Sequence, residues 1–281
     1  MSALLPAEQD AWSKYIYSIC GVSLDASKGY LIETRFSDLI RDTASTSFTE
    51  LIAKVKGDVS TKLRQKVIDA ITTNETSFFR DASPFELLQN KVIPDLIDLR
   101  TKTAVPGRPI PIRIWSAAAS TGQEAYTIGM ICKDLRLDPA KYDVRILGTD
   151  ISDKAITQAS LCKYSQLEIS RGLPADKIAK YFTVDGPHYK VRDEVRALAT
   201  FKKMNLLEPF AFPAPFDIVL CRNVAIYFTE PDRLRLYKAI ARSLAPDGYL
   251  IIGSTESIAG LCPEFEVKRY LRSAFYQFKK A

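Results

Sequence analysis

Beyond residue 110, strand-like and helical segments alternate along the chain, and this alternation constrains the fold more than any other feature. Short runs rich in β-branched residues are separated by longer stretches with helical spacing of apolar residues. The runs are PIRIWSA, YDVRILGTD, FDIVLCRN and GYLIIGS, and the helical stretches include QEAYTIGMICKDL and PDRLRLYKAIARSL. Because parallel strands need such crossover connections, the pattern predicts an α/β domain with a doubly wound, mostly parallel sheet.

Two segments depart from this alternation and predict antiparallel pairing. The segment YFTVDGPHYKVRDEV has a turn signal at Asp185, Gly186 and Pro187 between apolar residues, which is typical of a hairpin. We therefore expect a small antiparallel β excursion at about residues 181–198. The C-terminal FEVKRYLRSAFYQFKK contains two strand-like runs around Arg272 and Ser273, which predict an antiparallel edge on the main sheet.

The first seventy residues show only helical patterns. The segments AWSKYIYSIC, KGYLIETRFSDLIRD, SFTELIAKVK and STKLRQKVIDAIT each place apolar residues on one face, and Ser47 stands where a helix N-cap is expected. They predict a small all-helical domain over residues 1–72. Residues 73–110 are expected to form a linker and the first helix, at about 84–99, of a second domain whose main part spans residues 111–281.

The composition excludes several classes of protein. The only histidine, His188, argues against a histidine-rich metal centre and against catalytic triads with a histidine base. The five cysteines are widely spaced, so we expect reduced thiols in the core and no metal. The formal net charge is +6, but the basic clusters are too short for a nucleic-acid interface. No apolar run is long enough to cross a membrane and the first residues lack a secretory signal, so we expect a cytoplasmic protein without membrane insertion.

In a doubly wound sheet, ligands bind beyond the carboxyl ends of the strands, so the residues after each strand form the candidate site. The first strand runs into SAAASTGQE, whose small residues permit close approach of a ligand, although the spacing differs from the GxGxxG of dinucleotide enzymes. Asp150 ends the second strand, where it either accepts hydrogen bonds from a ribose or caps the helix that starts near Ser152. Asn205 and Asn223 follow two further strands, where each either binds a ligand or forms an Asx turn.

A polar segment, TTNETSFFRD, joins the two predicted domains. It either packs as a capped linker or lines a substrate cleft, because clefts form preferentially where domains meet. The pattern alone leaves both interpretations open.

Together these motifs resemble the chemotaxis receptor methyltransferases of the CheR type, which use S-adenosylmethionine. The resemblance covers nearly the full chain and rests on TTNETSFFRD, RIWSAAASTGQEAYTIGM, ILGTDIS, NLL at residues 205–207, FDIVLCRNVAIYF and PDGYLIIGSTES, in the family's order and spacing. The N-terminal GVSLDASKGYLIETRFSDLI is also similar to the family's helical domain. The resemblance implies a Rossmann-like class I methyltransferase fold. It also implies methyl transfer to glutamate side-chain carboxylates of chemoreceptors, with S-adenosylhomocysteine as the second product.

Carried over by motif position, the resemblance implies a cofactor site and two catalytic residues, and it implies no metal. The cofactor-binding residues would be Asn74, Thr76, Arg80, Glu124, Asp150, Asn205, Leu206, Asn223 and Val224. In this assignment Asp150 meets the ribose and Glu124 meets the positively charged amino-acid end of the cofactor. The family's catalytic proposals correspond to Arg80, which would position one oxygen of the acceptor carboxylate, and Tyr227, whose hydroxyl would support that geometry.

The expected partners are the cytoplasmic helical domains of chemoreceptors, which are long bundles rich in acidic residues. Basic residues of the helical domain either dock on such a bundle or form a solvated face; they are Lys28, Arg35, Arg41, Lys54 and Lys56. Family members that tether to a receptor's C-terminal pentapeptide have a longer, glycine-richer loop than Val184–Tyr189, so we do not expect pentapeptide binding. The alternative function is a protein of the same fold with a different acceptor or a sensing role.

Overall fold

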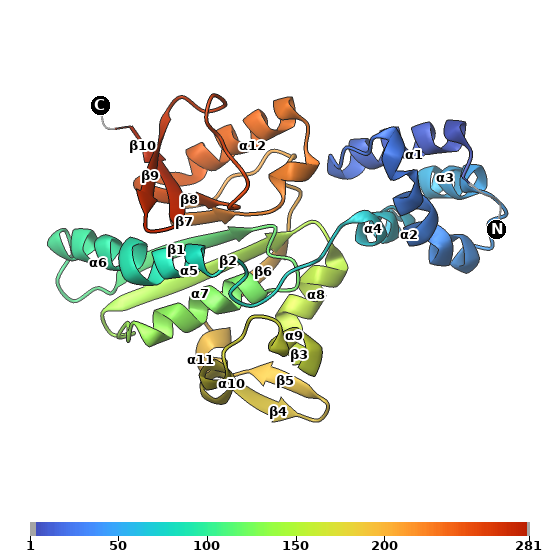
Figure 1. Ribbon diagram of the computed structural model, residues 1–281. Helices are drawn as coiled ribbons and strands as arrows, with labels where there is room; N and C mark the ends of the chain where they lie inside the picture. Colours follow the sequence, from blue (N-terminus) through green and yellow to red (C-terminus); the bar gives the residue numbers. More distant parts are fainter. Residues whose placement is uncertain (1–3, 280–281) are drawn as a thin grey trace.

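The structure is a computed structural model that describes residues 4–279. Figure 1 shows a helical lobe near the N-terminus, a central sheet with helices on both faces, and a small antiparallel sheet below it. The helices of the lobe are α1 (Pro6–Cys20), α2 (Gly29–Asp42), α3 (Phe48–Gly57) and α4 (Lys62–Ile71), with a 3-10 turn at Ala26–Lys28. The predicted all-helical domain is confirmed.

Trp12 lies at the centre of this helical lobe. Its side chain is fully buried, and its ring centroid lies 4.7 Å from that of Phe36 on α2. Its indole N–H donates to the carbonyl of Phe48 at 3.1 Å, so one side chain joins α1, α2 and α3. The predicted N-cap of α3 is also confirmed, because the Ser47 Oγ accepts from the Glu50 N–H at 3.1 Å.

The main sheet has the strand order β6-β2-β1-β7-β8-β10-β9. Its strands are β1 (Ile110–Ala117), β2 (Tyr142–Asp150), β6 (Ala199–Lys203), β7 (Phe216–Cys221), β8 (Leu244–Ile252), β9 (Phe265–Tyr270) and β10 (Ser273–Phe278). The strands from β6 to β8 in this order pair in parallel, whereas β10 runs antiparallel to both β8 and β9. The predicted doubly wound sheet with an antiparallel edge is therefore confirmed.

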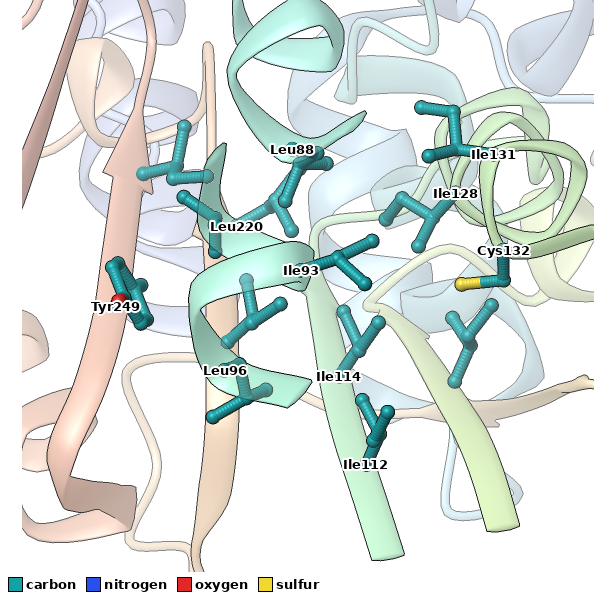
Figure 2. Packing of buried hydrophobic residues seen from close by; sticks show 14 of the residues in the cluster. Leu88, Ile93, Leu96, Ile112, Ile114, Ile128, Ile131, Cys132, Leu220 and Tyr249 are labelled. Atoms are coloured by element: carbon teal, nitrogen blue, oxygen red, sulfur yellow. The ribbon is translucent and has the colours of Figure 1, made fainter. Parts of the chain in front are cut away.

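Alternate residues of the central strand β1 face opposite layers. Ile112 and Ile114 belong to a core formed with α6 (Ile93–Lys102) and α7 (Gln123–Asp134), as Figure 2 shows. Trp115 points to the other face, where it shares a second core with α12 (Glu230–Ser243). Burial on both faces explains why the strand reads as a nearly continuous apolar run.

The helix expected at about residues 84–99 is interrupted. The helices α5 (Ser83–Leu87) and α6 are joined by a π-helical turn, η2, at Leu88–Val92. Pro94 lies just after this turn, and a proline lacks an N–H and clashes with the carbonyl four residues before it. The wider π turn accommodates the missing N–H and the steric clash. The spacing of apolar residues does not reveal a single π turn within a helix.

The small sheet has the strand order β3-β5-β4. The strands β4 (Phe182–Asp185) and β5 (His188–Val191) form the predicted hairpin around a two-residue turn, in which Gly186 has a φ of 59°. The third strand, β3 (Lys163–Ser165), was not predicted, because three residues are too short for a recognisable pattern. The neighbouring helices are α8 (Asp153–Leu161), α9 (Gln166–Ser170), α10 (Ala175–Tyr181) and α11 (Asp193–Arg196).

The cysteines and the histidine have the environments that the composition suggests. All five cysteines are free and buried, and burial raises the pKa of the Cys132 thiol to about 12. His188 is exposed on the small hairpin. Over residues 4–279, no helix is long and apolar enough to span a bilayer. The same described residues contain no group of three or more His, Cys, Asp or Glu side chains that could hold a metal ion.

Arg100 ties α6 to two strands of the main sheet through ion pairs. Its Nη2 lies 2.6 Å from Asp217 Oδ1 on β7 and 2.7 Å from Asp247 Oδ1 on β8. The hydrogen bond from Arg100 lowers the pKa of the Asp247 carboxyl, against the opposing effect of burial. A carboxyl with a lowered pKa in the folded state stabilises the fold above about pH 4, and this contribution is lost as the pH falls through the folded-state value.

We therefore expect Arg100→Met to lower the free energy of unfolding by about 2 kcal/mol at pH 7. This value is below that of a fully buried pair, because the Asp247 side chain is 37% exposed. Urea unfolding at pH 7 and pH 3 measures the effect, and the difference from the wild type should shrink at pH 3. The control is Lys102→Met, an exposed position of the same helix, which should change stability by less than about 0.5 kcal/mol. Equal losses at both pH values would contradict the ion-pair interpretation.

Candidate functional site

A cleft lies at the carboxyl ends of the parallel strands and is lined by both the sheet domain and the helical lobe. The chain proceeds from β1 to β2 and β6 on one side and then returns to β7 on the other side of β1. Such a reversal of strand order leaves a crevice at the carboxyl ends of the two central strands. All the residues assigned above to the cofactor and catalytic sites line this cleft; they are Asn74, Thr76, Arg80, Glu124, Asp150, Asn205, Leu206, Asn223, Val224 and Tyr227.

The loop after β1 brings backbone and small side chains into the cleft. Ala118, Ser120 and Gly122 have positive φ values of 60°, 49° and 95°, so the loop folds back tightly before α7 begins. At Gly122 a Cβ atom would lie 2.9 Å from the Cβ of Ala159 on α8, so only glycine allows this approach. The small side chains leave the backbone N–H groups at the start of α7 close to the cleft.

Asp150, at the end of β2, ties this loop to the next one. Its Oδ2 accepts from the Ser120 N–H and its Oδ1 from the Ser152 N–H, both at 2.9 Å. Burial raises the pKa of Asp150, and these backbone donors partly oppose the rise. The N-cap of α8 is Ser152, whose Oγ accepts from the Ala155 N–H, so the interpretation of Asp150 as the helix cap is wrong. A carboxylate oxygen accepts more than one hydrogen bond, so Asp150 retains capacity toward the cleft.

The two asparagines have different local roles. Asn205 Oδ1 accepts from the Leu207 N–H at 3.1 Å, so the Asx-turn interpretation holds at this position. Asn223 has a φ of 56°, in the left-handed region that asparagine tolerates better than most residues. Its N–H donates to Glu256 Oε2 at 2.7 Å, which joins the loop after β7 to the segment after β8. The Asn205 side chain also donates from Nδ2 to Glu208 Oε1 at 3.1 Å, so its amide is held on both sides.

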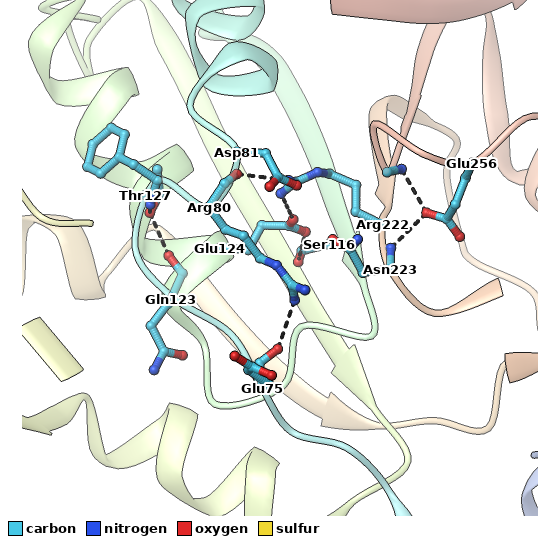
Figure 3. Close-up of polar contacts among 12 residues, drawn as sticks. Glu75, Arg80, Asp81, Ser116, Gln123, Glu124, Thr127, Arg222, Asn223 and Glu256 are labelled. Atoms are coloured by element: carbon cyan, nitrogen blue, oxygen red, sulfur yellow. Dashed lines mark hydrogen bonds and ion pairs between the residues drawn. The ribbon is translucent and has the colours of Figure 1, made fainter. Parts of the chain in front are cut away.

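Glu124 pairs with Arg222, a buried arginine that was not among the predicted site residues. Its Oε1 accepts from Ser116 Oγ at 2.7 Å, and its Oε2 accepts from Arg222 Nη1 at 2.8 Å. The Arg222 side chain directly follows β7 and is only 2% exposed. Figure 3 shows that its guanidinium also meets the carbonyl of Arg80, at 2.8 Å, and the carboxylate of Asp81, at 2.9 Å. The available signal was a charged residue at the end of an apolar strand, on the edge of the sheet where ligands bind.

The TTNETSFFRD segment packs as a linker and also borders the cleft, and the helix that follows it, α5, begins without a side-chain cap. Phe78 is fully buried, and its ring packs edge-on against that of Tyr164 on β3, at a centroid distance of 5.0 Å. The residues from Thr72 to Ser77, and Arg80, line the cleft. Among them, Arg80 donates from Nη1 to the backbone carbonyl of Glu75 at 2.8 Å, which orients its side chain along the segment (Figure 3). The segment is therefore a packed linker that also forms part of the site.

The helical lobe forms one wall of the cleft, which therefore lies where the two domains meet. The Ser23 N–H donates to the backbone carbonyl of Tyr227 at 3.0 Å, and Arg35 Nη2 donates to Thr73 Oγ1 at 3.0 Å. The lobe residues that line the cleft are Cys20, Val22, Ser23, Leu24, Lys28, Leu31, Arg35, Ile71 and Thr72. Two of the basic residues considered for receptor docking, Lys28 and Arg35, thus face the cleft.

Comparison with known families agrees with this architecture. Residues 7–72 match the family described as CheR methyltransferase, all-alpha domain, and residues 74–271 match CheR methyltransferase, SAM binding domain. The chain belongs to the CheR methyltransferase family. It is therefore an enzyme, an S-adenosylmethionine-dependent methyltransferase, and the resemblance noted from its motifs is confirmed.

Curated relatives share nearly the whole length of this CheR methyltransferase. Chemotaxis protein methyltransferase Cher2 of Pseudomonas putida is 36% identical over 269 residues, which cover 94% of this chain and 95% of that protein. Chemotaxis protein methyltransferase of Vibrio anguillarum is 35% identical over 284 residues, which cover 99% of this chain and 100% of that protein. The relatives thus include both the helical lobe and the sheet domain.

Proposed function

We propose that this CheR methyltransferase acts in the cytoplasm on glutamate side chains of chemoreceptor helical domains, giving glutamyl methyl esters and S-adenosylhomocysteine. The observation that carries the proposal is the composition of the cleft, where the Arg80 guanidinium and the Tyr227 phenol share one space with carboxylates and amides at the strand ends. A glutamate with a pKa near 4.3 is already ionised at pH 7, so the acceptor needs no general base. The enzyme has to orient the carboxylate and remove water from it.

The cleft residues fit S-adenosylmethionine, which supplies an electrophilic methyl group on a sulfonium when it is bound. Asp150 would accept from the ribose hydroxyls, and Leu206 and Val224 would supply apolar contacts for the base. Glu124 would pair with the ammonium group of the amino-acid end, because a carboxylate that already accepts from Ser116 and Arg222 has lone pairs left for a third donor. The remaining contacts would come from the other cleft residues assigned above, Asn74, Thr76, Arg80, Asn205 and Asn223.

Arg80 is the residue that we assign to the acceptor carboxylate. Its guanidinium has five N–H donors, and one nitrogen donates to the Glu75 carbonyl, so further donors remain for a substrate. Full neutralisation would weaken the nucleophile, so Arg80 holds one carboxylate oxygen and leaves the other to attack the methyl carbon. The Tyr227 hydroxyl donates to the held oxygen. Tyr227 ends a 3-10 turn, Ala225–Tyr227, whose last carbonyl is fixed by the Ser23 N–H of the helical lobe.

Transfer of radiolabelled methyl from S-adenosylmethionine to receptor-rich membranes tests this proposal. Mild base hydrolyses a glutamyl methyl ester and releases volatile methanol, whereas a methyl group on nitrogen stays on the protein. We expect enzyme-dependent, base-labile label, and none with membranes from cells that lack chemoreceptors. Label that resists base would assign a different acceptor to the enzyme. Absence of label, despite demonstrated binding of S-adenosylhomocysteine, would favour a sensing role instead.

We also propose that the enzyme acts without binding a receptor's C-terminal pentapeptide. The β4–β5 turn contains only Gly186 and Pro187, which leaves no extended loop to clasp a peptide. Calorimetric titration with a free pentapeptide from a chemoreceptor tail is expected to give no binding heat at micromolar concentrations. The same protein sample should bind S-adenosylhomocysteine, which verifies that it is folded. Micromolar affinity for the peptide would refute this part of the proposal.

A further inference from the structure

The turn that carries Arg80 has an unusual backbone. Phe79, Asp81 and Ala82 have positive φ values of 50°, 64° and 24°, and none of them is glycine. Residues with a Cβ atom rarely adopt this region, and such conformations persist only where surrounding contacts maintain them. Arg80 lies within this stretch, so the contacts that maintain the turn also set where its guanidinium points.

Two side chains from other elements hold this turn. Thr127 on α7 accepts through Oγ1 from the Phe79 N–H at 3.2 Å. Arg222, directly after β7, donates from Nη2 to the carbonyl of Arg80 at 2.8 Å and to Asp81 Oδ2 at 2.9 Å. The turn is therefore attached on one side to a helix and on the other to the carboxyl end of a central strand.

We propose that the ion pair between Arg222 and Asp81 is a clamp that positions Arg80 for methyl transfer, an inference that rests on the function proposed above. The pair joins a buried guanidinium to a partly exposed carboxylate, so it adds little net stability, but it fixes the geometry of the groups that it joins. Here the guanidinium is enclosed, lying 5.3 Å from the ring centroid of Phe85. The same guanidinium binds Glu124. The clamp therefore sets the turn with Arg80 relative to the residue assigned to the amino-acid end of the cofactor.

The substitution Asp81→Ala tests the clamp without touching Arg80 or the cofactor residues. Arg222 keeps Glu124 and the Arg80 carbonyl as partners, and the Asp81 side chain is 36% exposed, so no isolated buried charge is created. We expect kcat for methyl transfer to fall by about 10- to 100-fold, because small misplacements of a positioning group have effects of this size. The affinity for S-adenosylhomocysteine, measured by calorimetry, should stay within about twofold, since the clamp acts on the acceptor side of the site.

Two further variants serve as a conservative substitution and a control for Asp81→Ala. Asp81→Asn retains an oxygen acceptor and a residue that tolerates left-handed φ, so it should recover most of the lost kcat. Glu86→Gln changes an exposed acidic residue of α5 and should leave kcat unchanged. If thermal melting shows that Asp81→Ala does not fold, Asp81→Gly replaces it with the same expectations, because glycine favours the positive φ of this position.

A double-substitution cycle distinguishes positioning from a general structural role. Once Arg80→Ala has removed the positioned group, adding Asp81→Ala should lower kcat by less than twofold further. Equal factors in the two backgrounds, or wild-type kcat in Asp81→Ala, would overturn the clamp alone. Wild-type kcat in Arg80→Ala would overturn the proposed role of Arg80 and the clamp with it. Absence of base-labile label from the wild-type enzyme would instead reject the proposed function itself.

Discussion

Arg80→Ala is expected to lower kcat for receptor methylation by about 100- to 1000-fold, the range seen when one preorganised donor is removed from an active site. The loss arises because the acceptor carboxylate no longer has a fixed orientation toward the methyl group and retains more of its hydration. Initial rates of base-labile label, at saturating receptor and S-adenosylmethionine, measure kcat. Affinity for S-adenosylhomocysteine should change by less than about tenfold, so the effect falls on turnover and not mainly on cofactor binding.

Arg80→Lys separates the charge of this residue from its geometry. An ammonium keeps the positive charge but lacks the planar fork of a guanidinium, so we expect kcat to remain at least about tenfold below that of the wild type. Arg145→Ala is the matched control, because Arg145 on β2 is 72% exposed and pairs with Asp143 at 2.9 Å. This control should have wild-type kcat. Near-wild-type turnover of Arg80→Lys would show that the carboxylate is not held by the guanidinium fork.

The elements that have a hydrophobic period or a characteristic turn sequence could be predicted from the sequence. The alternation of β-branched runs with helical periodicity determines the parallel sheet, and the turn at Gly186 and Pro187 determines the small hairpin. The place of Asp150 followed from where an apolar strand stops. The hydrogen-bond partners of Asp150 could not be predicted, because its bonds to Ser120 and Ser152 depend on two loop conformations that have no periodic pattern in the sequence.

Features that depend on tertiary contact were not predictable in this way. Amphipathic spacing shows that the N-terminal helices have a buried face, but it does not show that the lobe borders the cleft through residues such as Arg35. The role of Arg222 was missed for a related reason, since a strand-end arginine is recognised as a clamp only when Asp81 and Glu124 are seen beside it. Such contacts join segments distant in sequence, and a single sequence contains no record of which distant segments meet.

Trp115→Ala is expected to lower the free energy of unfolding by about 3–5 kcal/mol, the usual cost of removing a large buried aromatic side chain. Trp115 on β1 is fully buried, and its ring centroid lies 4.9 Å from that of Phe212 and 5.6 Å from that of Phe216. Urea unfolding measures the loss. Val105→Ala, at a position that is 60% exposed, is the control and should change stability by less than about 0.5 kcal/mol. A loss of less than about 1 kcal/mol in Trp115→Ala would contradict this account of the core.

Trp115→Phe tests how the core supports the cleft. It keeps an aromatic ring but removes the indole N–H, which donates to the buried hydroxyl of Thr149 at 2.9 Å. The backbone carbonyl of Thr149 accepts from the Ala119 N–H of the cleft loop at 2.8 Å, and the next residue is Asp150. We expect a stability loss of about 1–3 kcal/mol together with severalfold weaker binding of S-adenosylhomocysteine.

The melting temperature measures this weaker binding, because a ligand that binds only the folded state stabilises it by an amount set by its concentration relative to Kd. At one fixed concentration, S-adenosylhomocysteine should therefore raise the melting temperature of Trp115→Phe less than that of the wild type. Equal rises in the two proteins would show that the core and the cofactor site are energetically independent.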